Sequence, residues 1–333
     1  MKLSKKLLAI TALAAAFAAP AQAQDKSVKF VLDFVPLGRH APWYVALAKG
    51  YFKDEKLDVS ILPSKGTADA IRMVESGIAE LGLVDVPSLV ASGSAGANIR
   101  MVAVNYQKPP YCVFSLNPGA NVSSPKDMVS LEIGSSTSSF VPQIFRAFMQ
   151  MNGQDGSSLK VVNIDGAARV PMLAARKVAA IDTFLMSEPS IRRAVTGAQP
   201  KCLFLGDYGL DIYSNGIGVK DSYLKANPDV VKGFVRAALR GWQYALNNPE
   251  EAARLQIQYI KALDPQVAAE EIQILRRVAI TPDVEKDGYG VVSLDKMRRT
   301  VKFINDNVAV TGTPLTAEGI YAPGYLPNPP IRP

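Results

Sequence analysis

Few side chains in this chain of 333 residues could carry out catalysis. The sequence contains one histidine, His40, and two cysteines, Cys112 and Cys202, so it cannot supply several histidines to a zinc ion or four thiolates to an iron–sulfur cluster. It has neither a Gly-x-x-x-x-Gly-Lys-Ser/Thr phosphate loop nor a Gly-x-Ser-x-Gly nucleophile turn. A Ser-His-Asp triad would have to use His40, which no nucleophile motif accompanies. We therefore expect no catalytic residue, no metal and no cofactor.

Several polar or glycine-bearing turns indicate ligand binding rather than catalysis. Each of these turns follows a strand-like run and precedes a helical pattern. In open α/β sheets, ligands bind beyond the carboxyl ends of the strands, where helix N-termini expose backbone N–H groups. The sequence therefore predicts binding in a cleft. The alternative for each hydroxyl, such as those of Thr67, Ser88 and Ser138, is that it only caps a helix. The turns span residues 33–40, 64–67, 85–87, 135–139, 163–166 and 187–189.

Short apolar runs alternate with helical patterns around these turns, which is typical of βαβ units with mostly parallel sheets. One series runs from residue 28 to 104 and a second from 113 to 205. The two series predict an α/β fold with two lobes that face each other across one cleft. After residue 219 the chain is largely helical. The main helices are expected over residues 41–49, 68–76, 140–151, 170–175, 228–246, 250–260, 265–277 and 294–307.

The first 23 residues are typical of a secretory signal peptide. Lys2, Lys5 and Lys6 precede an apolar run over residues 7–19, and a small-residue cleavage site follows at residues 21–23. The run is too short to span a bilayer, which takes ~20 residues, and no cysteine follows it to carry a lipid anchor. We predict a soluble protein that is exported to the periplasm.

The charges of the chain do not favour a nucleic-acid partner. The formal net charge is +7, and the predicted signal peptide carries three lysines and no acid. The other lysines and arginines are mixed with acids, as in the stretch Lys53-Asp54-Glu55-Lys56. Nucleic-acid binding requires a clustered basic surface, so we expect none here.

The two cysteines lie in similar strand-like segments, residues 111–114 and 201–204. In an oxidising compartment Cys112 and Cys202 could form a disulfide. They could equally remain buried thiols, because the sequence does not give the distance between them.

A long stretch near the N-terminus resembles a known family. Residues 32–52, Leu-Asp-Phe-Val-Pro-Leu-Gly-Arg-His-Ala-Pro-Trp-Tyr-Val-Ala-Leu-Ala-Lys-Gly-Tyr-Phe, are similar to the opening of certain periplasmic substrate-binding proteins. That superfamily includes binders of hydroxymethylpyrimidine thiamine precursors, of alkanesulfonates, taurine and nitrate, and the pyrimidine synthase of fungal thiamine biosynthesis. The resemblance continues through Leu57-Asp58-Val59, Gly66-Thr67-Ala68-Asp69, residues 77–82 and Ala180-Ile181-Asp182, and so covers about residues 28–245.

The resemblance implies a two-lobed type II periplasmic-binding-protein fold with a hinge of two crossovers. Lobe one would comprise residues 24–106 and 209–333, and lobe two residues 107–208. The hinges are expected at residues 105–108 and 205–211.

Proteins of this fold close on a ligand by hinge motion. The resemblance implies a monomeric solute-binding component that delivers a small molecule to the permease of an ABC importer in the inner membrane. The sequence does not distinguish such a transport component from a sensor protein that presents its lobes to another membrane partner.

The ligand pocket of the family can be carried over position by position. In lobe one it falls on the first loop, on the Gly66-Thr67 turn and on the end of the third strand. In lobe two it falls on the turns after the inner strands. The implied ligand-binding residues are Asp33, Phe34, Pro36, His40, Trp43, Gly66, Thr67, Asp85, Ser135, Ser136, Thr137, Ser138, Asn163, Phe184 and Glu188.

The charges of these turns favour one ligand class. Asp33, Asp85 and Glu188 could accept hydrogen bonds from amino or ring N–H groups, aromatic residues could sandwich a flat ring, and the nearest bases are Arg39 and Lys65. We therefore expect a nitrogen heterocycle such as a hydroxymethylpyrimidine.

Two alternatives to a heterocycle-binding protein remain, one with another ligand and one with another function. A sulfonate, taurine, nitrate or another small organic anion could bind, because helix N-termini alone can hold an anion. A third possibility is a pyrimidine-forming enzyme like the fungal ones, which consume a histidine of their own and use pyridoxal phosphate. His40 lies in the matching region, but the cysteine-rich segment of the fungal enzymes is missing.

Overall fold

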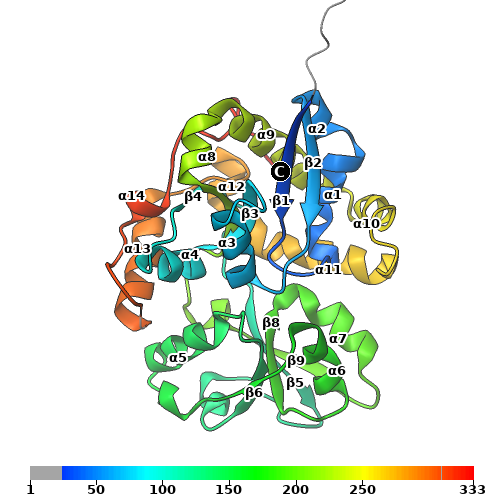
Figure 1. The fold of residues 1–333 in the computed structure, drawn as a ribbon. Coiled ribbons are helices and arrows are strands. Elements are labelled where there is room, and N and C mark those ends of the chain that lie inside the picture. The colour runs from blue at the N-terminus through cyan, green and yellow to red at the C-terminus, as the bar shows by residue number, and fades with distance from the viewer. Residues whose placement is uncertain (1–24, 309) are drawn as a thin grey trace, which may run out of the picture.

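The computed structural model describes residues 25–308 and 310–333 and contains two five-stranded sheets, one above the other in Figure 1. The predicted signal peptide, residues 1–23, lies outside the described residues. Each sheet is flanked by helices, so the predicted α/β class is confirmed. We call the part built on the first sheet lobe one and the part built on the second sheet lobe two.

Lobe one combines the first four strands of the chain with β10 and the C-terminal helices. Its strand order is β2 (Leu57–Leu62), β1 (Lys26–Val31), β3 (Leu81–Asp85), β10 (Asn215–Lys220) and β4 (Ile99–Val104). Its helices are α1 (Ala41–Ala48), α2 (Tyr51–Asp54), α3 (Thr67–Glu75), α4 (Val86–Ser94), α8 (Asp221–Ala226), α9 (Pro228–Asn247), α10 (Pro249–Ile257), α11 (Pro265–Ala279), α12 (Pro282–Asp287), α13 (Leu294–Asn307) and α14 (Ala317–Ile320).

Lobe two is smaller and lies below lobe one in Figure 1. Its strand order is β7 (Lys160–Asn163), β6 (Glu132–Ser135), β8 (Ala180–Phe184), β5 (Tyr111–Asn117) and β9 (Gln199–Phe204). Its helices are α5 (Val141–Met151), α6 (Arg169–Ala174) and α7 (Glu188–Ala194). Short 3-10 turns in the two lobes cover Gly38–His40, Pro125–Met128, Gly156–Ser158, Gly166–Ala168, Leu185–Ser187 and Leu205–Tyr208.

Both sheets are mixed, although the sequence predicts mostly parallel ones. Strand β10 is antiparallel to β3 and β4, and β5 is antiparallel to β8 and β9, whereas β1 and β6 are parallel to both of their neighbours. β5 and β10 are the first strands after the chain passes from one lobe to the other. A chain that enters a lobe at the cleft must run away from the cleft, so these two strands take the opposite direction.

Two connections join the lobes, residues 105–110 between β4 and β5 and residues 205–214 between β9 and β10. The predicted boundaries after residues 106 and 208 fall within them. The connections also bind each other, because the amide N–H of Tyr106 donates to the carbonyl of Asn215 over 2.8 Å and that of Ser214 to the carbonyl of Tyr106 over 3.2 Å. We propose that they form the hinge.

Aromatic side chains fill the core of lobe one between α1, α9 and the sheet. Trp43 is fully buried, with its ring centroid 4.5 Å from that of Phe30 and 5.8 Å from that of Trp242. The 20-residue α9 begins at Pro228, where a helix tolerates proline, and ends at Asn247, before Pro249 starts α10. Burial of these rings is the main source of stability for the packing of α1 and α9 on the sheet.

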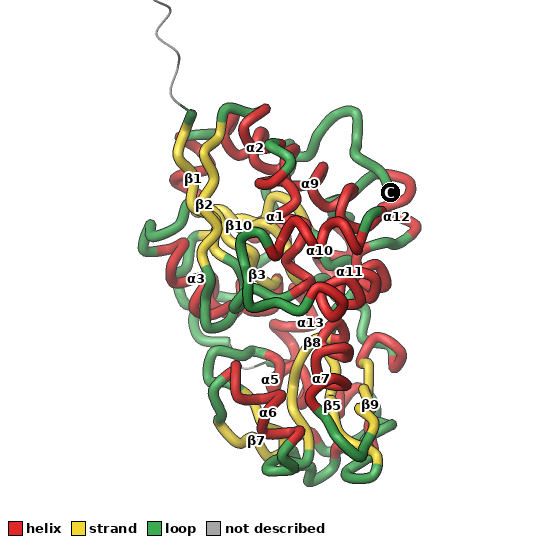
Figure 2. The backbone as a smooth tube through the Cα atoms, turned by 90° about the vertical axis from the view of Figure 1, so that its right-hand side faces the viewer, coloured by secondary structure: helices red, strands yellow, loops and turns green. Residues whose placement is uncertain are grey.

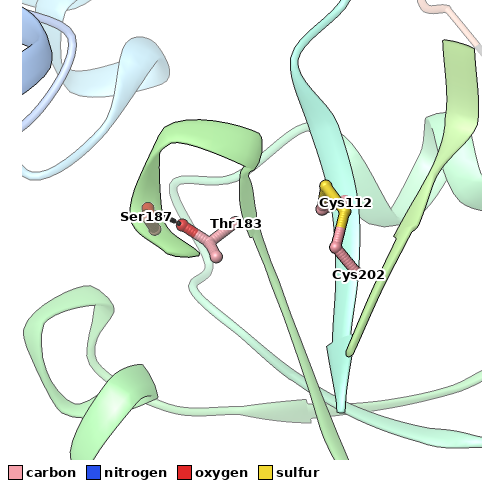
Figure 3. Close-up of a disulfide and its surroundings, with 4 residues drawn as sticks. All are labelled: Cys112, Thr183, Ser187 and Cys202. Atoms are coloured by element: carbon pink, nitrogen blue, oxygen red, sulfur yellow. Dashed lines mark hydrogen bonds between the residues drawn. A yellow bond between two sulfur atoms is a disulfide. The ribbon is translucent and has the colours of Figure 1, made fainter. Parts of the chain in front are cut away.

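Cys112 on β5 and Cys202 on β9 form a disulfide, with Cα atoms 5.5 Å apart (Figure 3). The bond joins an edge strand to the strand that enters lobe two. In the same view the hydroxyls of Thr183 and Ser187 lie 2.9 Å apart at the end of β8.

Within residues 25–308 and 310–333, no helix is long and apolar enough to cross a membrane. Nor does this part of the chain bring together three or more histidine, cysteine, aspartate or glutamate side chains that could hold a metal ion.

Candidate functional site

A cleft between the two lobes encloses about 660 Å³ of space, counting the open solvent at its mouth. Its walls come from the loops at the cleft ends of the strands in both lobes. Lobe one contributes Asp33, Phe34, Leu37, Arg39, Lys65, Gly66, Thr67 and Asp85, and lobe two contributes Tyr111, Ser136, Ser138, Ser139, Phe140, Val141, Arg169, Thr183 and Phe184.

The strand directions explain why these residues meet. β1, β3, β6 and β8 all end at the cleft, so the residues that follow them face the opposite lobe. β5 begins there and places its first residue, Tyr111, in the wall. This agrees with the general position of ligand sites in open α/β sheets.

The structure brings most of the sequence-predicted residues to this region. Eight of them line the cleft: Asp33, Phe34, Gly66, Thr67, Asp85, Ser136, Ser138 and Phe184. Two more, Thr137 and Asn163, line a groove that adjoins the cleft and shares Phe34, Lys65, Ser136 and Ser138 with it.

The other five predicted residues do not line the cleft. Trp43 belongs to the core described above. Glu188 begins α7, and its carboxylate binds Arg192 on the surface of that helix, with Oε1 3.1 Å from Nε. Ser135 and His40 are fully buried, and Pro36 lies in the first loop between Phe34 and Leu37 without facing the cavity. These residues lie in or beside the predicted turns, but they are not part of the cleft wall.

Several residues of the wall were not predicted. Arg39 was named only as a nearby base, and Arg169, Tyr111, Phe140 and Thr183 were not singled out. Arg169 follows the 163–166 turn, so its position near a strand end is the one signal that could have indicated it. The others adjoin predicted residues or a hinge.

Asp33 is saturated by groups of its own lobe. Oδ1 lies 2.7 Å from Nε2 of His40 and 3.1 Å from Nη2 of Arg39. Oδ2 accepts from Nη2 of Arg39 over 3.2 Å and from Nδ2 of Asn215 over 2.9 Å. Burial alone would raise the pKa of Asp33, but Arg39 and His40 together hold it below its ordinary value. The carboxylate is therefore ionised and has little capacity left for a ligand.

His40 supports Asp33 as a neutral ring. The amide N–H of Leu37 donates to Nδ1 of His40 over 2.9 Å, so the ring proton lies on Nε2 and is donated to Asp33. Burial, together with the charge of Arg39, lowers the pKa of His40 to about 4.

Arg169 is fixed in the same manner in lobe two. Its Nη1 donates to Oδ1 of Asp182 over 2.9 Å and to the carbonyl of Asp182 over 2.7 Å. The second carboxylate oxygen of Asp182 accepts from the hydroxyl of Ser139 over 2.6 Å. The guanidinium group is thus neutralised by a carboxylate that is fully buried behind the wall.

Asp85 differs from Asp33 because no cation pairs with it among the described residues. Its Oδ1 accepts from the amide N–H of Ser88 and its Oδ2 from the Ser88 hydroxyl, each over 2.8 Å, so it caps α4. Burial raises the pKa of Asp85, against hydrogen bonds from Ser88 and Thr67. A carboxylate offers about four acceptor positions, so Asp85 keeps capacity for a donor in the cleft.

The fold and the cleft define the class to which the protein belongs. The structure is similar to the alkanesulfonate-binding protein SsuA from Xanthomonas axonopodis pv. citri, solved with bound MOPS, with a TM-score of 0.73 and 11% identity over 91% of this chain and 100% of that one. The fold is that of the periplasmic binding proteins, as predicted.

Sequence comparison identifies the family within that class. The chain belongs to the NMT1/THI5-like family, whose model matches residues 38–252. It is 26% identical to the formylaminopyrimidine-binding protein of Halalkalibacterium halodurans over 75% of this chain and 76% of that protein. It is 28% identical to the riboflavin-binding protein RibY of Chloroflexus aurantiacus over 80% and 76%. A relative named as 4-amino-5-hydroxymethyl-2-methylpyrimidine phosphate synthase, from Legionella pneumophila, is 25% identical over 68% and 72%.

Proposed function

We propose that this protein is the solute-binding component of an ABC importer and captures a small nitrogen heterocycle in the cleft between its lobes. In this proposal it is a soluble periplasmic monomer after removal of residues 1–23, and it delivers the ligand to a permease in the inner membrane. Two relatives named as binders of a pyrimidine and of riboflavin support a heterocyclic ligand.

The observation that carries the proposal is the charge distribution of the cleft wall. Each of the two arginines in the wall already has a carboxylate partner, Asp33 for Arg39 and Asp182 for Arg169. Asp85 has no such partner among the described residues, and beyond its hydrogen bonds from Ser88 it keeps acceptor positions at the end of β3. Aromatic side chains, Phe34 and Phe184, line the same space. A flat ring with an amino or ring N–H group matches this combination.

A sulfonate or other small anion is the second candidate. Lys65, Arg39 and Arg169 all line the cleft. An anion could pair with Lys65 directly, but it could pair with Arg39 or Arg169 only if it displaced part of the existing carboxylate pairing. That exchange would leave Asp33 or Asp182 buried without its cation, which is costly. The heterocycle therefore fits the wall better.

The enzyme alternative has less support from the geometry. His40, the histidine in the region that matches the fungal enzymes, is fully buried beneath Asp33 and does not line the cleft. A pyrimidine-forming reaction would need it exposed to the reacting molecules. We therefore propose that the protein is not an enzyme, although some relatives are named as synthases.

Thermal melting of residues 24–333 with a ligand panel tests the proposed function. The panel holds 4-amino-5-hydroxymethyl-2-methylpyrimidine, riboflavin, thiamine, nitrate, taurine and MOPS, and the protein is first partly unfolded to remove carried-over ligand. A ligand at 100 times its Kd should stabilise the protein by ~2.7 kcal/mol. We expect a heterocycle to raise Tm in the wild type and to do so at least tenfold less effectively in Asp85→Asn, which retains a cap on α4.

Glu188→Gln is the matched control, because it makes the same change of carboxylate to amide outside the cleft. It should leave binding within twofold of the wild type. A response to MOPS or taurine alone would overturn the heterocycle and support the anion, and no response to any compound would contradict the binding function itself.

A further inference from the structure

Two arginine–phenylalanine pairs cross the cleft in opposite directions. The guanidinium carbon of Arg39, in lobe one, lies 5.0 Å from the ring centroid of Phe184 in lobe two. The guanidinium carbon of Arg169, in lobe two, lies 5.5 Å from the ring centroid of Phe34 in lobe one. Each lobe thus contributes one cation and one ring, and both pairs stand in the wall of the same cleft.

Each guanidinium group is also bound by a carboxylate of its own lobe. Asp33 binds Arg39 and Asp182 binds Arg169, and the side chains of the two arginines are only 6% and 14% exposed. A guanidinium group can do both things at once, because it donates hydrogen bonds in its plane and stacks on aromatic rings through its face. The carboxylates therefore orient the arginines toward the opposite lobe.

The backbone of lobe two that faces the Phe34 ring also fits this arrangement. A Cβ atom at Gly166 in lobe two would lie 2.7 Å from Cε2 of Phe34, so glycine leaves room there for the ring from lobe one. The ring is enclosed between Gly166 and Arg169, which belong to the same turn and the helix that follows it.

We propose that Arg39 and Arg169 are positioning residues of lobe closure, which hold Phe184 and Phe34 in place across the cleft. The two aromatic walls are then complete only when the lobes are together, and a bound ring is released only when both pairs separate. This inference rests on the proposed function as a binding protein. It assigns to both arginines a role other than that of partner for an anionic ligand.

Other contacts also cross between the lobes, from α7 to α11. The Ser190 hydroxyl donates to Glu271 over 2.5 Å, and Arg193 pairs with Asp264 over 2.8 Å. Arg192 pairs with Glu270, and its side chain is 48% exposed. Solvent-exposed ion pairs contribute little, so Arg192 provides a control for a cross-lobe contact outside the cleft.

The test measures Kd and the dissociation rate of the folded protein with 4-amino-5-hydroxymethyl-2-methylpyrimidine and, in parallel, riboflavin. The variants are Arg169→Met, Arg169→Lys, Phe34→Leu and the double variant Arg169→Met/Phe34→Leu. We expect Arg169→Met to weaken binding about tenfold, mainly through faster dissociation, and Arg169→Lys to weaken it less. The double variant should bind no more than about twofold more weakly than Phe34→Leu alone, because the second change removes a contact already lost.

Two arginine variants serve as controls. Arg240 lies 4.0 Å from the ring of Tyr51, but both residues are in lobe one, so Arg240→Met removes a cation–aromatic pair without touching closure. Arg240→Met and Arg192→Met should each stay within about twofold of the wild-type Kd.

Three outcomes would overturn the inference. These are unchanged binding by Arg169→Met, fully additive losses in the double variant, or an equal loss in Arg240→Met. In all three the wild type still binds, so the proposed function stands. If the wild type binds neither probe and nothing in the melting panel, the proposed function fails and this inference fails with it. A role in stability alone would lower Tm of Arg169→Met without changing its Kd.

Discussion

At the scale of single residues, the two carboxylates of lobe one that line the cleft differ in what surrounds them. Asp33 accepts from the cation Arg39 as well as from His40 and Asn215, whereas the hydrogen bonds to Asp85 come from Ser88 and Thr67, which carry no charge. A buried charge is costly unless it is paired. Asp33 is therefore a structural anion that orients Arg39, and Asp85 is the carboxylate that we propose for ligand recognition.

The neutral state of His40 makes stability depend on pH. The pKa of His40 is about 4 in the folded protein, whereas that of an ordinary histidine is 6.5. Between these values the unfolded chain binds a proton that the folded protein does not. The free energy of unfolding should therefore fall as pH decreases from about 6.5 to about 4. His40→Gln retains an acceptor for Leu37 and a donor for Asp33 but does not titrate.

Urea unfolding of both proteins at pH 7 and pH 4.5 checks this prediction. We expect the variant to gain about 2–3 kcal/mol relative to the wild type on acidification, from ~1.4 kcal/mol per pKa unit. Other buried acids, such as Glu271, titrate alike in both proteins and cancel in the difference. A difference that does not change with pH would contradict the neutral assignment of His40.

At the scale of elements, lobe two depends on a covalent bond between β5 and β9. β9 is an edge strand, and it leads directly into the second connection between the lobes. The disulfide between Cys112 and Cys202 closes a loop with a sequence separation of 90. A cross-link of that length restricts the unfolded chain strongly.

Reduction should therefore destabilise the protein by about 4 kcal/mol. The measurement is the urea midpoint of the wild type with and without dithiothreitol. Cys112→Ala/Cys202→Ala, which has no thiol to reduce, is the control and should show the same midpoint in both buffers. An unchanged wild-type midpoint would show that the bond does not limit stability.

At the scale of the whole molecule, the backbone of lobe one lies against lobe two at Gly66. A Cβ atom there would lie 3.0 Å from both Cβ and the carbonyl oxygen of Ser138 in lobe two. α11 of lobe one also lies against α7 of lobe two (Figure 2). The lobes are thus in contact at two places.

Gly66→Ala should hinder closure and weaken ligand binding by about tenfold or more. Gly77→Ala is a matched control, because Gly77 also has a positive φ, +77° against +144° for Gly66, but has open space around it. Both variants should lose stability from backbone strain, by roughly 1–3 kcal/mol. Only Gly66→Ala should lose affinity, as measured by isothermal titration, and equal losses in the two variants would refute a contact between the lobes at this position.

The sequence by itself determined the local elements and the places where the chain turns toward the cleft. The predicted helix over residues 294–307 coincides with α13, and the other main helices agree to within a few residues. Apolar periodicity, proline and glycine act over a few neighbouring residues, so they can be identified in the sequence alone. The turns after β1, β3, β6 and β8 were located for the same reason.

Only the tertiary structure decided which side chains at those turns face the cleft. Glu188 and Trp43 lie on helices next to correctly located turns. Glu188 binds Arg192 on the surface of α7, whereas Trp43 packs in the core. Asn215 reaches Asp33 from 182 positions along the chain, through a strand whose direction is set by the crossing between lobes. Orientation around a helix axis and contacts between distant strands depend on packing of the whole chain, and no local pattern carries that information.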